Sequence, residues 1–177
     1  MRSTGEVLGL AQDFPLAFYK AEEAAGDELP HAPAAWENKK VLISLSNKEN
    51  LKDQVITIGK TLKDLGFTLI GTQGTADFYN ACGIKCDVVN KIGGGRPDVV
   101  DLIMNKDVCL VINTPKAQRN YAEDRKTIRK ACLKYKVPYI TTLAGALAAV
   151  KGIQSVKNGN GGEGGVKSLQ EYHSMIR

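Results

Sequence analysis

The sequence has 177 residues, of which 43% are hydrophobic and 24% are charged, as in one globular domain with short appendages. No stretch approaches the roughly 20 apolar residues that cross a bilayer, and the start lacks a signal-peptide pattern. We therefore expect a cytoplasmic protein with no membrane partner. Four scattered cysteines and two histidines do not have the spacing of a zinc site, so we expect free thiols and no metal.

The charge is distributed unevenly along the chain. Residues 1–38 contain two basic and seven acidic residues, whereas the remaining chain contains 22 basic and 12 acidic residues. A basic domain can bind nucleic acid, a membrane surface or small anions. Because the basic residues are dispersed and aromatic residues make up only 6% of the chain, the pattern favours small anions over nucleic acid.

The N-terminal part of the chain, residues 1–30, differs in character from residues 39–177 and is predicted to be a separate unit. It predicts one amphipathic helix, residues 14–25. The residues expected on its apolar side are Phe14, Phe18, Ala21 and Ala25. Residues 31–38, which contain Pro33, are predicted to be a linker.

Residues 39–177 show a regular alternation of short apolar runs and amphipathic segments. The predicted strands cover residues 40–45, 68–71, 85–90, 108–113 and 138–142. The predicted helices cover residues 51–67, 75–83, 97–106, 120–136 and 143–152. This alternation predicts an α/β fold, a doubly wound, mainly parallel five-stranded sheet flanked by helices. A glycine-rich loop, residues 157–165, and a terminal helix or strand, residues 166–177, complete the chain.

The residues that end the predicted strands are candidates for a ligand site, because such sheets bind ligands beyond the carboxyl ends of their strands. All of them carry hydroxyl, amide or ammonium groups. They are Ser44, Ser46, Thr72, Thr75, Asn90, Lys91, Asn113, Thr114, Thr141 and Thr142.

The turn "GTQGT", residues 71–75, combines hydroxyls with consecutive amides at the start of a helix. Thr72, Gly74 and Thr75 could hold a phosphate there, because free N–H groups and the helix dipole favour an anion. Alternatively, Thr75 is only the N-cap of its own helix. The turn lacks the lysine of GxxxxGK[ST] and the glycine spacing of GxGxxG, which excludes both nucleotide motifs.

Four cationic residues could contribute to an anion site. Lys91 is the best placed, because it follows a predicted strand directly. Lys52 lies at the start of the first helix of the basic region and could reach the same crevice, and Lys48 is an alternative candidate for this role. If they do not reach it, both are ordinary solvent-exposed lysines. Arg96, in the glycine-rich stretch 93–97, is either a phosphate ligand or an interface residue.

The remaining polar positions offer little for catalysis. The amide of Asn113 could read a base or a ribose, or could only tie down a loop. Asp98 is the one carboxylate that this mapping places near the crevice, and a lone acid without histidine is poor material for acid–base catalysis. Residues 123–130 are most simply a solvated helix face with charges paired four residues apart.

These motifs occur in an order that is similar to a known family. With "VNKIGGGRPDVVD" and "EDRKTIRKACLKYKVPY", the chain resembles the C-terminal end of the large subunit of carbamoyl phosphate synthetases. Residues 39–177 resemble its allosteric domain, which has the methylglyoxal-synthase-like fold. Residues 1–30 resemble the last helical segment of the preceding ATP-grasp domain. The resemblance implies that the chain is a fragment of an ATP-dependent ligase and that Met1 is an internal methionine.

The resemblance also implies a regulatory role without catalysis by this chain. UMP or IMP would bind as allosteric effectors of a glutamine-hydrolysing enzyme of arginine and pyrimidine biosynthesis. The implied partners are the catalytic domains of the same subunit and the glutaminase small subunit. No cofactor is implied here, since ATP and Mg²⁺ or Mn²⁺ would be bound by the catalytic domains alone.

The resemblance assigns roles to individual positions. The implied phosphate ligands are Lys52, Thr72, Gly74, Thr75 and Lys91, and those of the ribose and base are Asn113 and Thr114. The loop "SLSNKENL" is about two residues longer than in similar sequences, so the resemblance does not assign roles to Ser44, Ser46 and Lys48, which stay candidate contacts. Arg96, in the glycine-rich stretch, is a further candidate. Some family members respond to ornithine, but Ile140 stands where an acidic residue would be expected, which speaks against ornithine control here.

Two other functions share this fold. A methylglyoxal-synthase-type lyase would eliminate phosphate from dihydroxyacetone phosphate, and would need a carboxylate base and a histidine beside the phosphate. The strand end that should carry the aspartate reads Asn113-Thr114-Pro115 instead. A nucleotide cyclohydrolase module would share the Gly-Thr turn but has little in common with "GGGRPDVV".

Overall fold

The computed structural model describes residues 4–30, 39–46, 51–114, 122–159 and 167–175. Its strands are β1 (Lys40–Leu45), β2 (Thr68–Gly71), β3 (Cys86–Val88), β4 (Val108–Thr114) and β5 (Tyr139–Ile140). They form one sheet in the order β3-β2-β1-β4-β5, and every neighbouring pair is parallel. The predicted parallel α/β sheet is confirmed.

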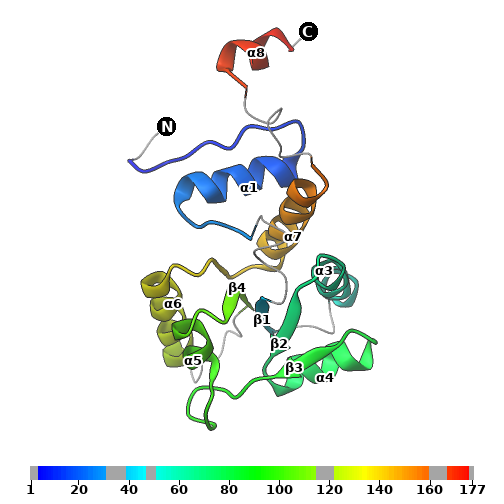
Figure 1. The fold of residues 1–177 in the computed structure, drawn as a ribbon, viewed down its shortest axis with the longest axis vertical. Helices are drawn as coiled ribbons and strands as arrows, with labels where there is room; N and C mark the ends of the chain where they lie inside the picture. Colours follow the sequence, from blue (N-terminus) through cyan, green and yellow to red (C-terminus); the bar gives the residue numbers. More distant parts are fainter. Residues whose placement is uncertain (1–3, 31–38, 47–50, 115–121, 160–166, 176–177) are drawn as a thin grey trace.

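Helices cover both faces of this sheet (Figure 1). They are α1 (Phe14–Ala25), α3 (Lys52–Asp64), α4 (Gln73–Ala81), α5 (Val99–Met104), α6 (Ala122–Tyr135), α7 (Leu143–Lys157) and α8 (Leu169–Ser174). Figure 1 shows α5 and α6 on one side of the sheet and α3 on the other. The fold is therefore doubly wound, as the alternating sequence predicts.

Each face of the sheet has its own buried apolar cluster. Val41 and Ile43 of β1 belong to the cluster that also includes buried residues of α3, α4 and α7. Leu42, between them in sequence, belongs to the other cluster, with buried residues of α5 and α6. Successive strand residues point to opposite faces, so a strand covered on both sides is a continuous apolar run.

The order of the strands reverses direction between β1 and β4. From β1 the chain moves outward through β2 to β3, and then returns to the far side of β1 to form β4 and β5. The connections that leave the carboxyl ends of β1 and β4 therefore diverge. Such a reversal point leaves a crevice where parallel sheets bind ligands.

The N-terminal helix packs on α7 and shares the core of the sheet. Tyr19 and Leu29 are buried in the same cluster as the strands, and the Tyr19 hydroxyl donates to the Leu29 carbonyl at 3.1 Å. The predicted apolar stripe is wrong in detail, because Phe14 is 69% exposed while Leu16 and Tyr19 are buried. Of these two, Tyr19 packs against Gly152 of α7. The boundary at residue 30 stays a prediction, and the linker lies outside the described residues.

The contact of α1 with α7 also explains why α7 is longer than predicted. The sequence predicts its end at Gly152, but the helix continues to Lys157. A Cβ atom at Gly152 would lie 2.7 Å from the Pro15 carbonyl oxygen and 3.0 Å from Tyr19 Cβ. Gly152 is thus a packing residue inside the helix rather than its end. The C-terminal segment forms α8, whereas residues 160–166 of the predicted glycine-rich loop lie outside the described residues.

The cysteines are free thiols, as predicted. Cys86, Cys109 and Cys132 are buried and Cys82 is half-buried. Burial raises the pKa of Cys109 and Cys132 to about 12, so these thiols stay protonated and unreactive near neutral pH. Among the described residues, no group of His, Cys, Asp and Glu could hold a metal ion, and no helix is long and apolar enough to cross a membrane.

Candidate functional site

A cavity of about 210 Å³ lies at the carboxyl ends of β1 and β4, where the sheet reverses. Its lining residues come from both of these strands, from the turn after β2, from the loop after β3 and from α5 and α6. They are Ser44, Leu45, Ser46, Thr72, Gly74, Thr75, Lys91, Ile92, Val99, Asn113, Thr114, Asp124, Arg125 and Ile128. Most of the strand-end residues predicted from the sequence are thus brought together.

Hydroxyl groups join the ends of β1 and β4 at the floor of the cavity. The backbone N–H of Ser46 donates to Thr114 Oγ1 at 3.0 Å, and the two hydroxyl oxygens lie 3.4 Å apart. Ser44 lies beside Asn113 in the register of the two strands. The cavity therefore has a fixed polar floor at the reversal point.

The turn "GTQGT" forms one wall of the cavity. α4 begins at Gln73 with Thr72 as its N-cap, and the Thr72 side chain makes no capping hydrogen bond. Thr75 is not the N-cap: it lies in the first turn, where its hydroxyl accepts from the Leu45 N–H at 3.3 Å. The interpretation of Thr75 as a mere cap is wrong. Thr72, the N-cap residue, lines the cavity with a side chain that makes no capping hydrogen bond. Thr75 links the turn to β1 through its hydrogen bond with Leu45.

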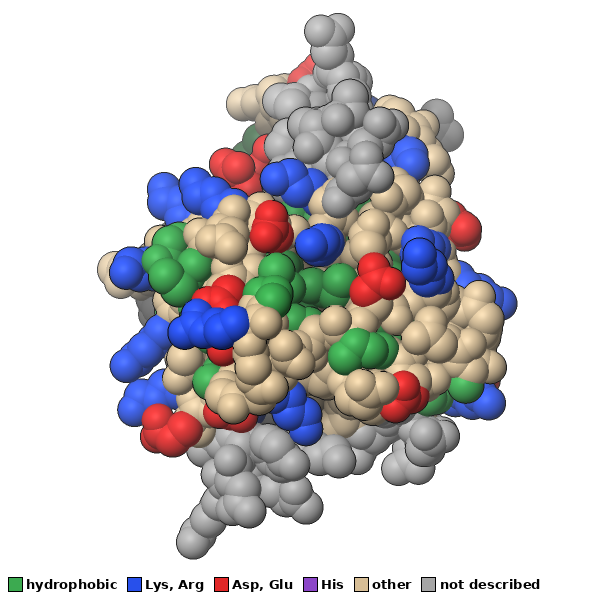
Figure 2. Space-filling view, turned by 60° about the horizontal axis from the view of Figure 1, so that its bottom comes forward, with side chains coloured by type: hydrophobic (Ala, Val, Ile, Leu, Met, Phe, Trp, Pro, Cys, Tyr) green, Lys and Arg blue, Asp and Glu red, His purple; other side chains and the backbone are tan. Residues whose placement is uncertain are grey.

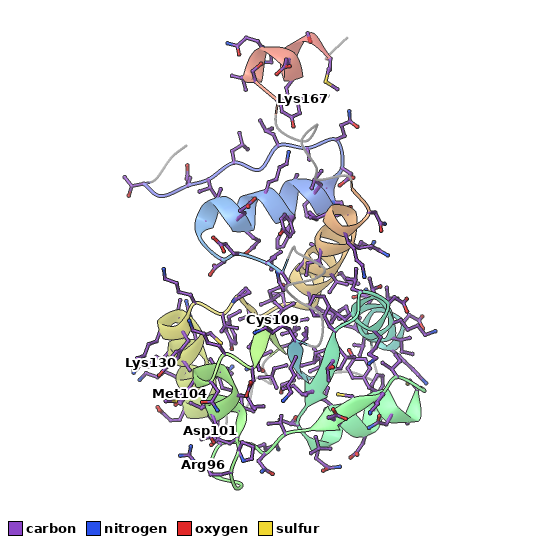
Figure 3. The ribbon with its side chains drawn as sticks, viewed as in Figure 1. Arg96, Asp101, Met104, Cys109, Lys130 and Lys167 are labelled. Atoms are coloured by element: carbon purple, nitrogen blue, oxygen red, sulfur yellow. The ribbon has the colours of Figure 1, made fainter. Side chains whose placement is uncertain are left out.

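The cationic candidates separate into those that reach the cavity and those that do not. Lys91 lines it, together with Arg125 of α6. Lys52 is the first residue of α3 and is exposed outside the lining, so its role stays a prediction, and Lys48 lies outside the described residues. Arg96 does not line the cavity, and its exposed side chain is ion-paired with Asp101. Figure 3 shows this pair together at the end of the molecule opposite Lys167.

Asn113 is the most buried amide of the site, at 7% exposure. Its Nδ2 donates to the Tyr139 hydroxyl at 3.1 Å. Burial raises the pKa of Tyr139, which keeps this hydroxyl neutral. Two other predicted strand-end groups serve the backbone instead: Asn90 Nδ2 donates to the Pro97 carbonyl and Thr142 caps α7.

The carboxylate of the cavity is not the one that the sequence suggested. Asp98 caps α5, where it accepts from the N–H groups of Val100 at 2.9 Å and Asp101 at 3.1 Å, and it does not line the cavity. The carboxylate in the lining is Asp124. The helix that carries it was predicted to be a solvated charged face, and this is where sequence reasoning missed part of the site. The signal was the spacing of Asp124 and Ile128, which places them one turn apart on the same side of α6.

The charge of the cavity suits an anion with hydroxyl groups. Of the described residues, two cationic side chains and one carboxylate lie in its lining, and the first turn of α4 brings the positive end of a helix dipole. Figure 2 shows Lys and Arg side chains scattered among Asp and Glu over the face in view, unlike a nucleic-acid interface.

Comparison with known proteins gives consistent matches. The family model described as "MGS-like domain" matches residues 54–141. The chain is 46% identical over 173 residues, 98% of its length, to a carbamoyl phosphate synthase large chain of Archaeoglobus fulgidus, of which it covers 15%.

Two further relatives carry the name "Carbamoyl phosphate synthase large chain, C-terminal section". The protein of Methanopyrus kandleri is 43% identical over 89% of this chain, and that of Aquifex aeolicus is 38% identical over 99% of it. This chain covers 28% and 31% of their lengths. It therefore spans less than a third of each of these three relatives.

Proposed function

We propose a function on the premise that this chain carries a domain of the MGS-like family and matches carbamoyl phosphate synthase large chains over nearly its whole length. The chain is the regulatory part of a glutamine-hydrolysing carbamoyl phosphate synthase of arginine and pyrimidine biosynthesis. It binds UMP or IMP as allosteric effectors and carries out no reaction itself. Its partners are the catalytic domains of the same large chain and the glutaminase small subunit.

The observation that carries this proposal is the composition of the cavity. Hydroxyls and an amide predominate among its polar lining groups, beside Lys91, Arg125 and the start of α4. The positive groups favour a phosphate. The amide, the hydroxyls of β1 and β4 and the Asp124 carboxylate favour the ribose and base of a nucleotide.

Individual roles follow from position in the cavity. Thr72, Gly74, Thr75 and Lys91 contact the phosphate, because they lie where α4 begins and where β3 ends. Asn113 and Thr114 contact the ribose or base from the end of β4. Ser44 and Ser46 stay candidate contacts on the floor.

The second candidate function is the lyase, and one observation favours it. Asp124 lines the cavity, so a carboxylate that could act as a base is present beside the proposed phosphate site. The described part of the lining supplies no histidine to assist it. Sensing therefore remains the better-supported function.

Calorimetric titration with UMP, IMP and dihydroxyacetone phosphate distinguishes the two functions. We expect micromolar binding of UMP or IMP, because a charge-assisted hydrogen bond contributes roughly 1.5–3 kcal/mol. Lys91→Ala should weaken it by about 10- to 100-fold, while Lys60→Ala, an exposed lysine of α3, serves as the matched control. A methylglyoxal assay with dihydroxyacetone phosphate runs alongside. Methylglyoxal formation that Asp124→Asn abolishes would overturn the sensing function.

A further inference from the structure

The outer face of α6 is basic and carries an exposed leucine. It consists of Lys126, Arg129, Lys130 and Leu133, whose spacing of three or four residues places them on one side of the helix. All four residues are exposed, and Leu133 is 65% exposed. The opposite side of α6 is buried at Ala131 and Cys132. A helix with one side in the core thus presents cations around an apolar side chain on its other side.

The charges along this face repel one another. Lys126 and Lys130 lie four residues apart, as do Lys130 and Lys134, and like charges at this spacing destabilise a helix. None of these three lysines forms an ion pair with another described residue. The opposite charges expected four residues apart on this helix are therefore not found at these positions. Carboxylates from outside the helix would relieve the repulsion.

Met104 enlarges the exposed apolar area beside this face. It is the last residue of α5, which packs against α6, and it is 48% exposed. Figure 3 shows Met104 and Lys130 on the same side of the molecule. Exposed apolar side chains that lie together and are bordered by polar groups are typical of a protein–protein interface. With the lysines, they favour a partner whose surface carries carboxylates and small apolar side chains.

The C-terminal end of α1 has the complementary charge. Glu22, Glu23, Asp27 and Glu28 form this acidic end of α1, and residues 21–38 contain no lysine or arginine. Two of these carboxylates lie in the last turn of the helix, where the helix dipole disfavours negative charge. Burial and the neighbouring Asp27 raise the pKa of Glu22, which reflects the same crowding of negative charge. No ion pair with another described residue neutralises the four carboxylates.

We propose that a second copy of this chain binds to the outer face of α6 through the acidic end of its own α1. Figure 1 shows the C-terminal end of α1 and α6 on the same side of the molecule. A two-fold axis between two copies therefore makes the contact twice, with α6 of each copy facing α1 of the other. In this arrangement Leu133 packs on the exposed Ala24 and Ala25, whose small side chains let the two helices approach.

The contact is independent of the proposed nucleotide binding. α6 contributes Asp124, Arg125 and Ile128 to the cavity, and none of these residues belongs to its outer face. Substitutions on the outer face should therefore change the self-association of the chain and leave its UMP affinity unchanged. A chain that binds no nucleotide would overturn the proposed function without affecting this inference.

Sedimentation equilibrium measures the association directly. We expect a monomer–dimer equilibrium with a dissociation constant on the order of 10–100 µM at about 50 mM NaCl, because each contact joins exposed charges over a small area. Raising the NaCl concentration to about 0.5 M should weaken the dimer at least about tenfold, since salt screens exposed charges. A chain that stays monomeric up to about 1 mM protein at low salt would overturn the inference.

Charge reversal tests which surfaces meet. Lys130→Glu and Glu23→Lys should each weaken the dimer by about 10- to 30-fold, because the two-fold axis makes each substitution act twice. Lys60→Glu is the matched control, since Lys60 is an exposed lysine of α3 and its reversal changes the net charge equally. If Lys60→Glu weakened the dimer as much as Lys130→Glu does, net charge rather than this face would govern the association, and the inference would be wrong.

A mixture of the two weakened variants identifies a second copy as the partner. When the Lys130→Glu chain is mixed with the Glu23→Lys chain, one contact of the mixed dimer has the original charges and the other has both charges exchanged. Both contacts then join opposite charges, so the mixture should associate within about threefold of the unchanged chain. A mixture that stays as dissociated as either variant alone would show that the outer face of α6 does not bind the acidic end of α1.

Leu133→Ala tests the apolar part of the contact. It should weaken the dimer about tenfold, because the substitution removes buried apolar area from both contacts. Leu169→Ala is the matched control, since Leu169 of α8 is 60% exposed and lies on neither surface. Equal dissociation constants for Leu133→Ala and the unchanged chain would contradict the packing of α6 on α1.

Discussion

Two glycine-containing segments follow neighbouring strands of the sheet, and they contribute to the cavity to different extents. The turn after β2, residues 71–75, places its hydroxyls and the start of α4 at the site. The loop after β3 places Lys91 and Ile92 there, but its more distant part, residues 93–97, folds onto the start of α5. Both segments contain groups that suit an anion. What differs is that the cation of the second segment, Arg96, is paired within its own loop, away from the cavity.

The local hydrogen bonds explain the difference. In the loop after β3, Asp98 and Asp101 form a capping box at the start of α5, and Arg96 is ion-paired with Asp101. The Arg96 guanidinium is thereby ion-paired within the loop. In the turn after β2, Thr72 caps α4 through its backbone conformation and keeps its hydroxyl. A hydroxyl or cationic side chain near a strand end can thus contact a ligand only if it is not already bonded to the groups that cap the next helix.

The largest expected effect comes from Gly71→Ala in the turn after β2. A Cβ atom at Gly71 would lie 2.9 Å from the Ile43 carbonyl oxygen and 3.3 Å from Thr75 Cβ. Because the nearest atom is backbone in the central strand, the overpacking should destabilise the fold by about 3 kcal/mol. Urea unfolding measures it. The matched change Gly94→Ala, whose nearest atom would be the Lys91 carbonyl oxygen at 3.2 Å, should cost clearly less. Equal losses would contradict the difference between the segments.

Thr75→Val tests the link between the turn and β1 in the absence of ligand. It removes the hydroxyl that accepts from the buried Leu45 N–H at 3.3 Å. An unpaired buried N–H should lower the free energy of unfolding by about 2 kcal/mol. Thermal unfolding measures this change, with Thr72→Val as the control, since the Thr72 side chain makes no capping bond. A larger loss for Thr72→Val than for Thr75→Val would reverse our assignment of the two hydroxyls.

Asp98→Ala tests whether the carboxylate of the second segment is structural. Its side chain accepts two N–H groups at the start of α5 and is 7% exposed, so we expect a loss of about 1 kcal/mol in stability. Asp98→Asn, which can still cap, should restore most of it. UMP affinity should stay within about twofold of the original, because one N-cap changes no charge in the lining. A loss of UMP affinity without a loss in the free energy of unfolding would show that Asp98 contacts the ligand.

The smallest expected effect belongs to Arg96→Ala. The guanidinium is 79% exposed, and exposed ion pairs contribute at most about 1 kcal/mol. Nucleotide affinity should not change measurably, in contrast to Lys91→Ala. Parallel titrations of the two variants give the result directly. If Arg96→Ala lowered the nucleotide affinity as much as Lys91→Ala does, residues 93–97 would belong to the site, and the two segments would not differ in this respect.

The fold was predictable because periodicity and glycine positions carry strong signals. Residues 40–45 are apolar on both faces, and Gly66 follows the first helix of the sheet domain, so β1 and α3 could be located. Two features were not predictable in the same way. Gly152 looked like a helix end because its packing partner, Pro15, lies more than a hundred residues away. Phe14 looked buried because residue type alone does not show which side of a helix meets a neighbour.

The site was predictable where the chain itself ends a strand. Thr72, Lys91 and Asn113 follow apolar runs, and the topology of a parallel sheet brings such ends together. Asp124 and Arg125 were missed because a helix reaches the cavity from the side, and only tertiary packing decides which of its charged residues face inward. Arg96 was a candidate phosphate ligand in the sequence, but in the structure it is ion-paired with Asp101. Asp101 belongs to the capping box of α5, and this pairing depends on the folded loop, which the sequence does not show.

The shortness of the outer strands has a consequence for how the chain behaves in solution. β3 has three residues and β5 has two, and these strands form the two edges of the sheet. An edge exposes backbone N–H and C=O groups to which another chain can add a strand, and proteins limit this hazard by keeping edge strands short. Neither edge here is long enough to align an incoming strand, so aggregation by strand addition is suppressed on both sides of the molecule.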